Sequence, residues 1–239
     1  MVPGKFRLLA AVAAILWSGM LAAADFTDSM NFDADRKTAA GGRASANVTA
    51  DGGAAVLRDN GVIVYDQVTL NNASGELSFR IRLDFDERSD DPRLKNVLRN
   101  QIFLTLARSD RNYASVYTAD GLRFGVFSPR GEVLFLLGAR SHFEKGVWYD
   151  VAIQWGRKVQ MLIDGKVVAE KEHDGLWGSL PAADTATLRI GREPGYGIVN
   201  EFSIDDLKLI SGDTERVAAA VPSIPGATAM PVIDRKSVV

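Results

Sequence analysis

Cysteine is absent from the 239 residues, and histidine occurs only twice, as His142 and His173. The missing cysteines exclude disulfide frameworks, zinc–thiolate sites, iron–sulfur clusters and cysteine nucleophiles, and two histidines are too few for a multi-histidine metal centre. Basic residues are not in excess either. With 28 Lys and Arg against 30 Asp and Glu, the net charge of −2 does not favour nucleic acid as a partner. A hydrophobic content of 46% with 24% charged residues is that of an ordinary globular protein.

The first 24 residues have the composition of a secretory signal peptide. Lys5 and Arg7 give a positive start, and an uncharged apolar run over residues 8–21 is followed by three alanines at 22–24. The run is shorter than the roughly 20 residues of a transmembrane span, and its small-residue end favours cleavage over anchoring. We therefore expect cleavage before Asp25, no stable membrane insertion afterwards, and a bacterial periplasmic or secreted protein.

Strand patterns dominate the chain after residue 56, and helical periodicity is limited to a short segment at 91–98. Residues 76–85 alternate strictly between polar and apolar side chains, which indicates a half-buried antiparallel strand. Turn signals recur about every 8–14 residues, the spacing of a sandwich or barrel. We predict one all-β domain over residues 25–212, and a flexible tail rich in proline and alanine over 213–239.

Four segments carry a resemblance to a known superfamily. They are 146–153 (GVWYDVAI), 159–168 (VQMLIDGKVV), 188–191 (LRIG) and 202–209 (FSIDDLKL). In this order they resemble the laminin-G-like and concanavalin-A-like lectin/glucanase superfamily. The resemblance implies a two-sheet antiparallel jelly-roll β-sandwich. Independently of it, Asp164-Gly165 predicts a tight hairpin, because both central residues need positive φ, and Trp148 begins a strand where it can plug the mouth of the sandwich. The resemblance does not specify a function, because these motifs mark strands and hairpins.

Catalytic patterns are weak. A retaining glycosidase needs two carboxylates about 5–5.5 Å apart. The pairs Asp84/Asp86 and Glu170/Glu172 have a suitable spacing, but both lie at strand ends beside polar loops, where solvated carboxylates are the simpler interpretation.

A polysaccharide lyase needs a tyrosine or histidine base beside a neutralising residue. Tyr113 and Tyr117 share one strand face and Arg123 is near them in sequence, although sheet packing also explains the two tyrosines. We therefore assign no catalytic residue.

Two loop aromatics are candidate ligand contacts. Trp177 lies in a Gly-rich loop, and Tyr196 lies between two glycines. An exposed aromatic ring can stack on the apolar face of a sugar, whereas the alternative is that each ring packs into the edge of the sandwich.

Asp205 and Asp206 interrupt the alternation of the last strand. A β-bulge here would keep Phe202, Ile204, Leu207 and Leu209 all facing inward. The resemblance implies a structural calcium ion with Asp206 as a ligand, and calcium would also need carbonyls and N-terminal acids such as Asp33 or Asp35. The alternative is that Asp206 caps the bulge or pairs with a basic residue.

The sequence thus favours an exported, non-catalytic binding module for a carbohydrate or for a cell-envelope or extracellular component. No cofactor is expected, and a structural calcium ion is only one of the two interpretations of Asp206. Two alternatives stay open. One is a hydrolase or lyase acting on a polysaccharide with the same fold, and the other is a protein-adhesion or structural domain without a sugar site.

Overall fold

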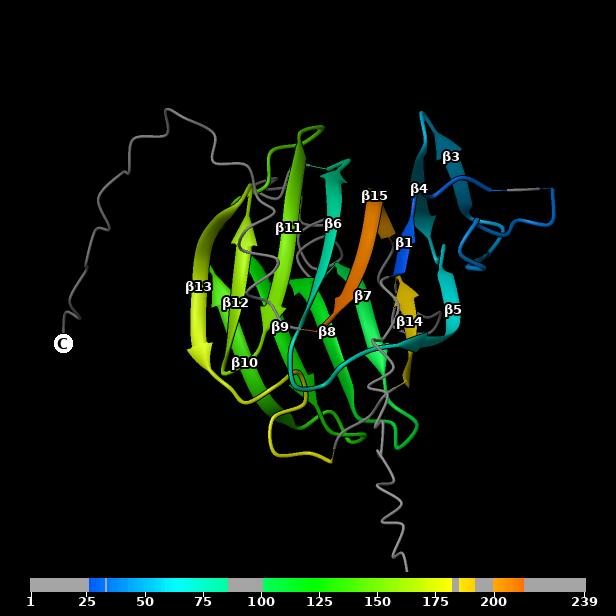
Figure 1. Cartoon of the computed structure of the whole chain (residues 1–239). Coiled ribbons are helices and arrows are strands. Elements are labelled where there is room, and N and C mark those ends of the chain that lie inside the picture. Colours follow the sequence, from blue (N-terminus) through cyan, green and yellow to red (C-terminus); the bar gives the residue numbers. More distant parts are fainter. Residues whose placement is uncertain (1–25, 33, 86–100, 182–184, 192–199, 213–239) are drawn as a thin grey trace, which may run out of the picture.

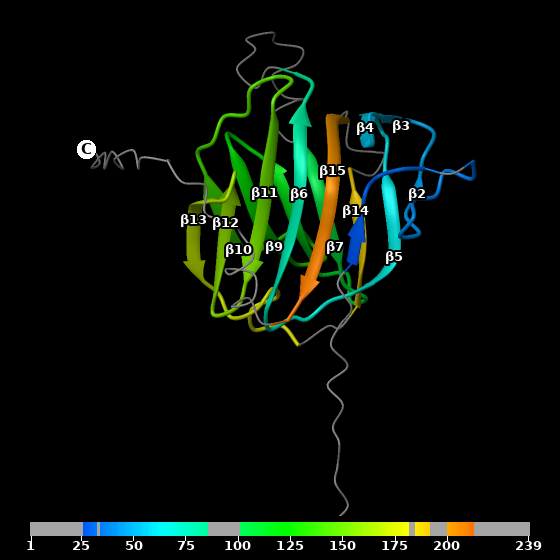
Figure 2. The same ribbon diagram turned by 45° about the horizontal axis from the view of Figure 1, so that its top comes forward.

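The computed structural model describes residues 26–32, 34–85, 101–181, 185–191 and 200–212. Every regular element within these ranges is a strand, and all strands pair antiparallel in two sheets. The sheets pack face to face, as Figures 1 and 2 show. The predicted all-β jelly-roll sandwich is therefore confirmed. The signal peptide, the C-terminal tail and the segment 91–98 lie outside the described residues. No helix long and apolar enough to cross a membrane occurs in the described ranges.

The eight-stranded sheet is the front layer of Figure 1. Its order is β13-β12-β11-β6-β15-β4-β3, and β1 adds to β15. The strands are β1 (Phe26–Asp28), β3 (Val48–Asp51), β4 (Ala54–Asp59), β6 (Gly75–Leu83), β11 (Trp148–Trp155), β12 (Lys158–Ile163), β13 (Lys166–Glu172) and β15 (Asn200–Ser211).

The seven-stranded sheet lies behind it, in the order β10-β9-β8-β7-β14-β5-β2. Its strands are β2 (Arg43–Ala44), β5 (Ile63–Thr69), β7 (Ile102–Ala107), β8 (Tyr113–Thr118), β9 (Leu122–Phe127), β10 (Val133–Ala139) and β14 (Thr185–Ile190).

Strand β15, the last strand among the described residues, occupies the middle of the eight-stranded sheet. One edge of β15 pairs with β6 along most of its length. The opposite edge is shared, because residues 200–204 pair with β4 and residues 207–209 pair with β1. Strand β15 therefore joins the N-terminal strands to β6, β11, β12 and β13 in one sheet.

The core fills the space between the two inner faces. Large side chains that are less than 2% exposed come from both sheets, and they include Phe79 and Phe202 from one sheet and Phe103 and Phe124 from the other. Phe103 and Phe202 meet across the interface edge to face, with ring centroids 5.2 Å apart. The alternation in β6 is as predicted, since Leu77, Phe79, Ile81 and Leu83 are all buried.

Two local predictions are confirmed. Asp164 and Gly165 form a two-residue hairpin with φ of 50° and 72°, the left-handed backbone that this turn requires. The register of β15 against β6 shifts between Asp205 and Lys208. This bulge places Phe202, Ile204, Leu207 and Leu209 in the core, each fully buried.

The prediction for Trp148 is wrong. Trp148 does begin β11, but its side chain lies on the outer face of the eight-stranded sheet and is half-buried. Its ring contacts the guanidinium groups of Arg80 and Arg82, 5.2 and 5.1 Å from the ring centroid. The register explains this position, because Trp148 lies directly opposite Arg82, an outward residue of β6.

Candidate functional site on the seven-stranded sheet

Three aromatic side chains cluster on the outer face of the seven-stranded sheet. Tyr113 and Tyr117 come from β8 and Phe127 from β9, and each is half-buried. Tyr113 lies opposite Phe127 in the register, and their rings stack at 5.0 Å with an interplanar angle of 20°. Tyr117 contacts Phe127 at 6.1 Å with a tilt of 52°. We call this cluster the aromatic face.

The period of two explains why these rings point outward. Between them, Ala114 and Val116 on β8 and Val126 on β9 are buried in the core. Gly125 then makes room for the cluster. A Cβ on Gly125 would lie 2.5 Å from the ring of Phe127, so the phenyl ring covers the place where a side chain would stand. The ring consequently lies close to the sheet and bridges towards both tyrosines.

Polar groups border the aromatic face on two sides. Arg123 lies opposite Tyr117, and its Nε donates a 2.7 Å hydrogen bond to the carbonyl of Ala119. A second row crosses the sheet in register, from Arg189 on β14 through Thr105 on β7 and Ser115 on β8 to Gly125. The hydroxyls of Thr105 and Ser115 are 3.3 Å apart. Hydroxyl and guanidinium donors thus lie beside an apolar platform.

The charged residues on the strands around the aromatic face are all basic. Strands β7, β8, β9, β10 and β14 contain no Asp or Glu, and their only charged residues are Arg123 and Arg189. These five strands therefore contribute only positive charge around the aromatic cluster. An anionic ligand would meet no carboxylate from these strands.

The three residues considered for a lyase lie together, but the pKa of Tyr117 is not that of a catalytic base. Tyr113, Tyr117 and Arg123 do share one face, as the sequence predicted. Burial raises the pKa of the Tyr117 phenol above its ordinary value, and the proximity of Arg123 offsets this only in part. Tyr117 therefore remains a neutral hydrogen-bond donor at neutral pH, whereas a lyase base must give up its proton readily.

Trp177 is not available as a ligand contact, and the alternative that its ring packs into the sandwich is the one observed. Trp177 is 1% exposed and belongs to the core. Its backbone N–H donates to Asn72 Oδ1 at 3.0 Å, and the guanidinium of Arg108 lies 5.5 Å from its ring centroid. The loop is pulled inward by these contacts, so a sugar cannot stack on the indole. Tyr196 lies outside the described residues.

The carboxylate of Asp206 faces a cation. Asp206 occupies the bulge of β15 with φ of 50°, and its Oδ2 is 3.8 Å from Arg80 Nη1. No group of three or more Asp, Glu or His that could hold a metal ion occurs among the described residues. Asp33 lies outside them. The ion pair within a bulge is the alternative that the sequence left open.

Two of the remaining candidate acids, Asp84 and Glu170, are held in ion pairs on the outer face of the eight-stranded sheet. Asp84 lies 2.6 Å from Arg58 and 3.2 Å from Arg82. Glu170 lies 2.7 Å from Lys158, and hydrogen bonds from Lys158 and Gln160 hold its pKa below its usual value. Asp86 is outside the described residues. A lowered pKa keeps Glu170 ionised, so Glu170 lacks the raised pKa of a general acid.

The sequence analysis missed Phe127. The signal was present in β9, where Arg123, Gly125 and Phe127 share one parity and Leu122, Phe124 and Val126 share the other. Applying the alternation to the end of the strand places Phe127 beside the outward tyrosines of β8. The search for sugar-binding aromatics was instead directed at loops.

Solved structures share this fold. Domain 4 of AbnA, a GH43 extracellular arabinanase from Geobacillus stearothermophilus solved with arabinotriose, matches at a TM-score of 0.51 and 15% identity, over 79% of this chain and 82% of that one. Botulinum neurotoxin type C, whose cell entry depends on interaction with two ganglioside molecules, matches at 0.53 and 13%, over 82% of this chain and 50% of that one. A sialidase from Trypanosoma rangeli matches at 0.51 and 12%, over 77% of this chain and 30% of that one.

These likenesses establish a common architecture. The chain spans half or less of the toxin and sialidase chains that it matches. No protein-family model matches the sequence, and no curated protein matches it. At identities of 12–15%, what the chain shares with these proteins is the β-sandwich fold.

Proposed function

We propose that this protein is an exported, non-catalytic binding module that recognises a glycan through the aromatic face. The observation that carries the proposal is the stack of Tyr113, Phe127 and Tyr117, which lies on neighbouring strands that contain no acidic residue. A soluble protein rarely leaves clustered aromatic rings outside its core without a binding role.

The chemistry of the face suits a sugar ring. The apolar C–H face of a pyranose or furanose packs against aromatic rings, which are large and rigid and lose little conformational entropy on binding. The hydroxyls of Thr105 and the two tyrosines border the platform and can donate to sugar oxygens. A glycan would therefore gain both apolar contact and directional hydrogen bonds.

The charge of the face favours an acidic glycan. Arg123 and Arg189 are the only charged residues on five neighbouring strands. A guanidinium recognises a carboxylate through paired hydrogen bonds, which are stronger than bonds between neutral groups. We infer a ligand with carboxylate-bearing sugars, held in the periplasm or outside the cell as an envelope or extracellular component. Proteins of this fold solved with arabinotriose or reported to interact with gangliosides are compatible with glycan binding.

The test is calorimetric titration of the full chain with acidic and neutral oligosaccharides of matched length. We expect the acidic series to bind more tightly, and its affinity to fall as salt rises. Tyr117→Ala should weaken binding about tenfold or more, in line with aromatic hot spots of about 2 kcal/mol. Arg123→Gln should remove most of the preference for the acidic series. Trp148→Ala is the matched control, since Trp148 is a half-buried outward aromatic on the other sheet.

Equal affinity for the acidic and neutral series would contradict the acidic assignment. Unchanged binding by Tyr117→Ala, with a normal melting temperature, would contradict the aromatic face as the site.

One observation favours a lyase as the second candidate, namely the register pair of Tyr117 and Arg123. Lyase action would release an unsaturated product that absorbs in the ultraviolet. We expect no such absorbance when the full chain is incubated with acidic polysaccharides, because the raised pKa of Tyr117 opposes its use as a base.

A further inference from the structure

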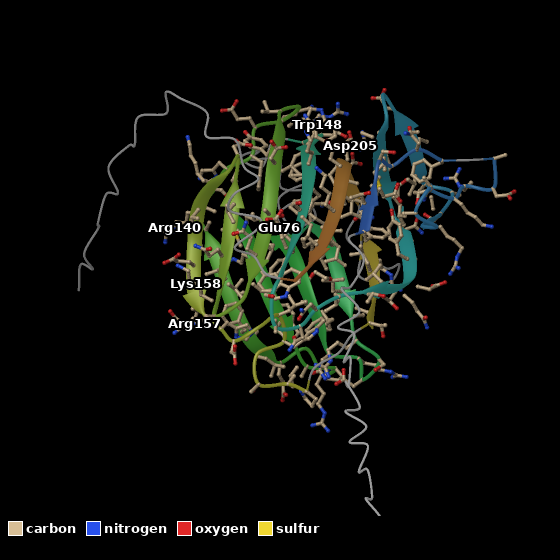
Figure 3. All side chains as sticks on the ribbon, viewed as in Figure 1. Glu76, Arg140, Trp148, Arg157, Lys158 and Asp205 are labelled. Carbon is tan, nitrogen blue, oxygen red and sulfur yellow. The ribbon has the colours of Figure 1, made fainter. Side chains whose placement is uncertain are left out.

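A polar row crosses the outer face of the eight-stranded sheet. Glu76 on β6 lies opposite Gln154 on β11, Gln154 lies opposite Gln160 on β12, and Gln160 lies opposite Glu170 on β13. Four strands thus place two amides side by side with a carboxylate at each end. Figure 3 shows Glu76 and Lys158 on this face, which it shares with Trp148 and Asp205.

The two carboxylates fix the orientation of the two amides. Gln154 Nε2 donates to Glu76 Oε2 at 2.7 Å, and Gln160 Nε2 donates to Glu170 Oε2 at 2.8 Å. Glu76 is only 8% exposed, so its side chain is held in place. Each amide still has its carbonyl oxygen and a second N–H, and neither oxygen accepts a bond from another described residue. The row is therefore a preorganised set of donors and acceptors.

A hollow lies directly against this row. It has a volume of about 390 Å³ and is lined by Ala73, Ser74, Gln154, Trp155, Gly156, Arg157, Lys158 and Gln160. Sites for small molecules run from roughly 300 to 1,000 Å³, so the hollow is large enough for a small ligand. Trp155 anchors this end of β11, since its indole is 1% exposed and donates through Nε1 to the carbonyl of Asn71 at 2.9 Å.

The charges around the hollow are balanced. The row contains two carboxylates, and the lining of the hollow contains two cations, Lys158 and Arg157. Lys158 is paired with Glu170, whereas Arg157 is exposed at the rim and has no hydrogen bond or ion pair with another described residue. A strongly charged ligand gains little here, while a ligand with many hydroxyls can bond to the remaining amide oxygens and N–H groups of Gln154 and Gln160.

We infer that this hollow is a second binding site, for the hydroxyl groups of a neutral saccharide. Vicinal sugar hydroxyls both donate and accept, which matches an amide oxygen and an amide N–H presented side by side on neighbouring strands. Glu76 and Glu170 act as positioning residues that hold the amides, and Gln154 and Gln160 contact the ligand. The two sites lie on opposite sheets, and the inference does not depend on the aromatic face.

The test is nuclear magnetic resonance of the full chain with neutral trisaccharides of arabinose, glucose, mannose, xylose and galactose. We expect at least one to shift the side-chain amide signals of Gln154 and Gln160 in a saturable manner. Gln154→Ala and Gln160→Ala should each weaken that binding about two- to tenfold, the range for a lost hydrogen bond. Ala73→Trp should abolish it by filling the hollow while leaving the polar row intact.

Gln67→Ala is the matched control, because Gln67 is an exposed glutamine on β5 of the other sheet and should leave binding unchanged. Tyr117→Ala should also leave it unchanged, which separates this site from the aromatic face. The inference is overturned if no trisaccharide moves the two amide signals at about 10 mM. It is equally overturned if Ala73→Trp, folded normally, binds like the original protein.

Discussion

The hydroxyl of Tyr65 donates a 2.9 Å hydrogen bond to the buried carboxylate of Asp28. Asp28 belongs to β1 of the eight-stranded sheet and Tyr65 to β5 of the seven-stranded sheet, so this bond joins the two layers directly. The same carboxylate accepts the backbone N–H of Met30 at 3.2 Å, and Phe26 packs edge-on against the Tyr65 ring at 5.0 Å. The N-terminal strand is thereby fastened to both sheets.

Removing the Tyr65 hydroxyl should destabilise the fold. Tyr65→Phe leaves a buried carboxylate oxygen without its donor, which costs about 1–3 kcal/mol of unfolding free energy. Urea unfolding followed by circular dichroism measures this change. Tyr149→Phe is the control, because the Tyr149 hydroxyl accepts an exposed N–H from Glu144 and its loss should cost less. Equal effects of the two substitutions would contradict the prediction.

Alkaline pH should weaken the fold through the same tyrosine. Burial, and secondarily the charge of Asp28, raise the pKa of Tyr65 far above its ordinary value. Its contribution to stability is therefore complete below the unfolded pKa of about 10 and is lost progressively as pH rises above that value. Stability measured from pH 8 to 11 should fall more steeply for the original protein than for Tyr65→Phe. Parallel curves would contradict this assignment.

Gly125→Ala should impair the aromatic face without a change of charge. The added Cβ would lie 2.5 Å from the Phe127 ring, so the ring must move away from its place between the two tyrosines. We expect glycan affinity to fall at least about threefold and stability to fall by about 1–3 kcal/mol, as for other overpacked sites. Gly138→Ala is the comparison, since its Cβ would be 3.3 Å from the movable end of Arg123. A larger loss of affinity in Gly138→Ala than in Gly125→Ala would show that the ring position is unimportant.

Asp206 should affect the stability of the fold through its backbone conformation and not through a bound metal. At φ of 50°, Asp206→Gly should change stability by less than about 1 kcal/mol, while Asp206→Ala should cost about 1–2 kcal/mol. Thermal melts with added calcium and with chelator should coincide for the original protein. A calcium-dependent melt that disappears in Asp206→Gly would instead make Asp206 a metal ligand.

Trp177 should matter for stability and not for binding. Trp177→Phe removes part of a side chain that is 1% exposed, with an expected cost of about 1–3 kcal/mol from the resulting cavity. Trp148→Phe is the control on the surface and should stay within about 0.5 kcal/mol. Glycan affinity of the folded Trp177→Phe protein should be unchanged, and a selective loss of affinity would restore Trp177 as a ligand contact.

The predictions that succeeded rest on short-range patterns. The alternation of β6, the Asp164-Gly165 hairpin and the bulge at Asp205-Asp206 each depend on a few consecutive residues, whose parity and turn chemistry are written in the sequence. The burial of Trp177, by contrast, depends on a long-range contact. It depends on hydrogen bonds from residues 176 and 177 to Asn72, a contact that joins segments 105 positions apart.

Both candidate sites depend on register between strands. Tyr117 lies opposite Arg123, and Gln154 lies opposite Gln160. Each pair joins two strands of one hairpin, so the alternation of the strands and the position of the turn could have predicted it. Glu76 is a distant partner, because β6 lies beside β11 through a connection of more than 60 residues that the alternation of single strands does not encode. The sandwich was therefore predictable from the sequence, whereas the polar row was not.

The central place of β15 also sets the order of assembly. Until residues 200–211 are available, the strands β13, β12, β11 and β6 have no partner connecting them to β4, β3 and β1. Folding must therefore wait for the end of the domain and close loops of well over 100 residues, a topology of high contact order and slow folding. A nascent chain that lacks residues 200–211 cannot complete the eight-stranded sheet and remains incompletely folded.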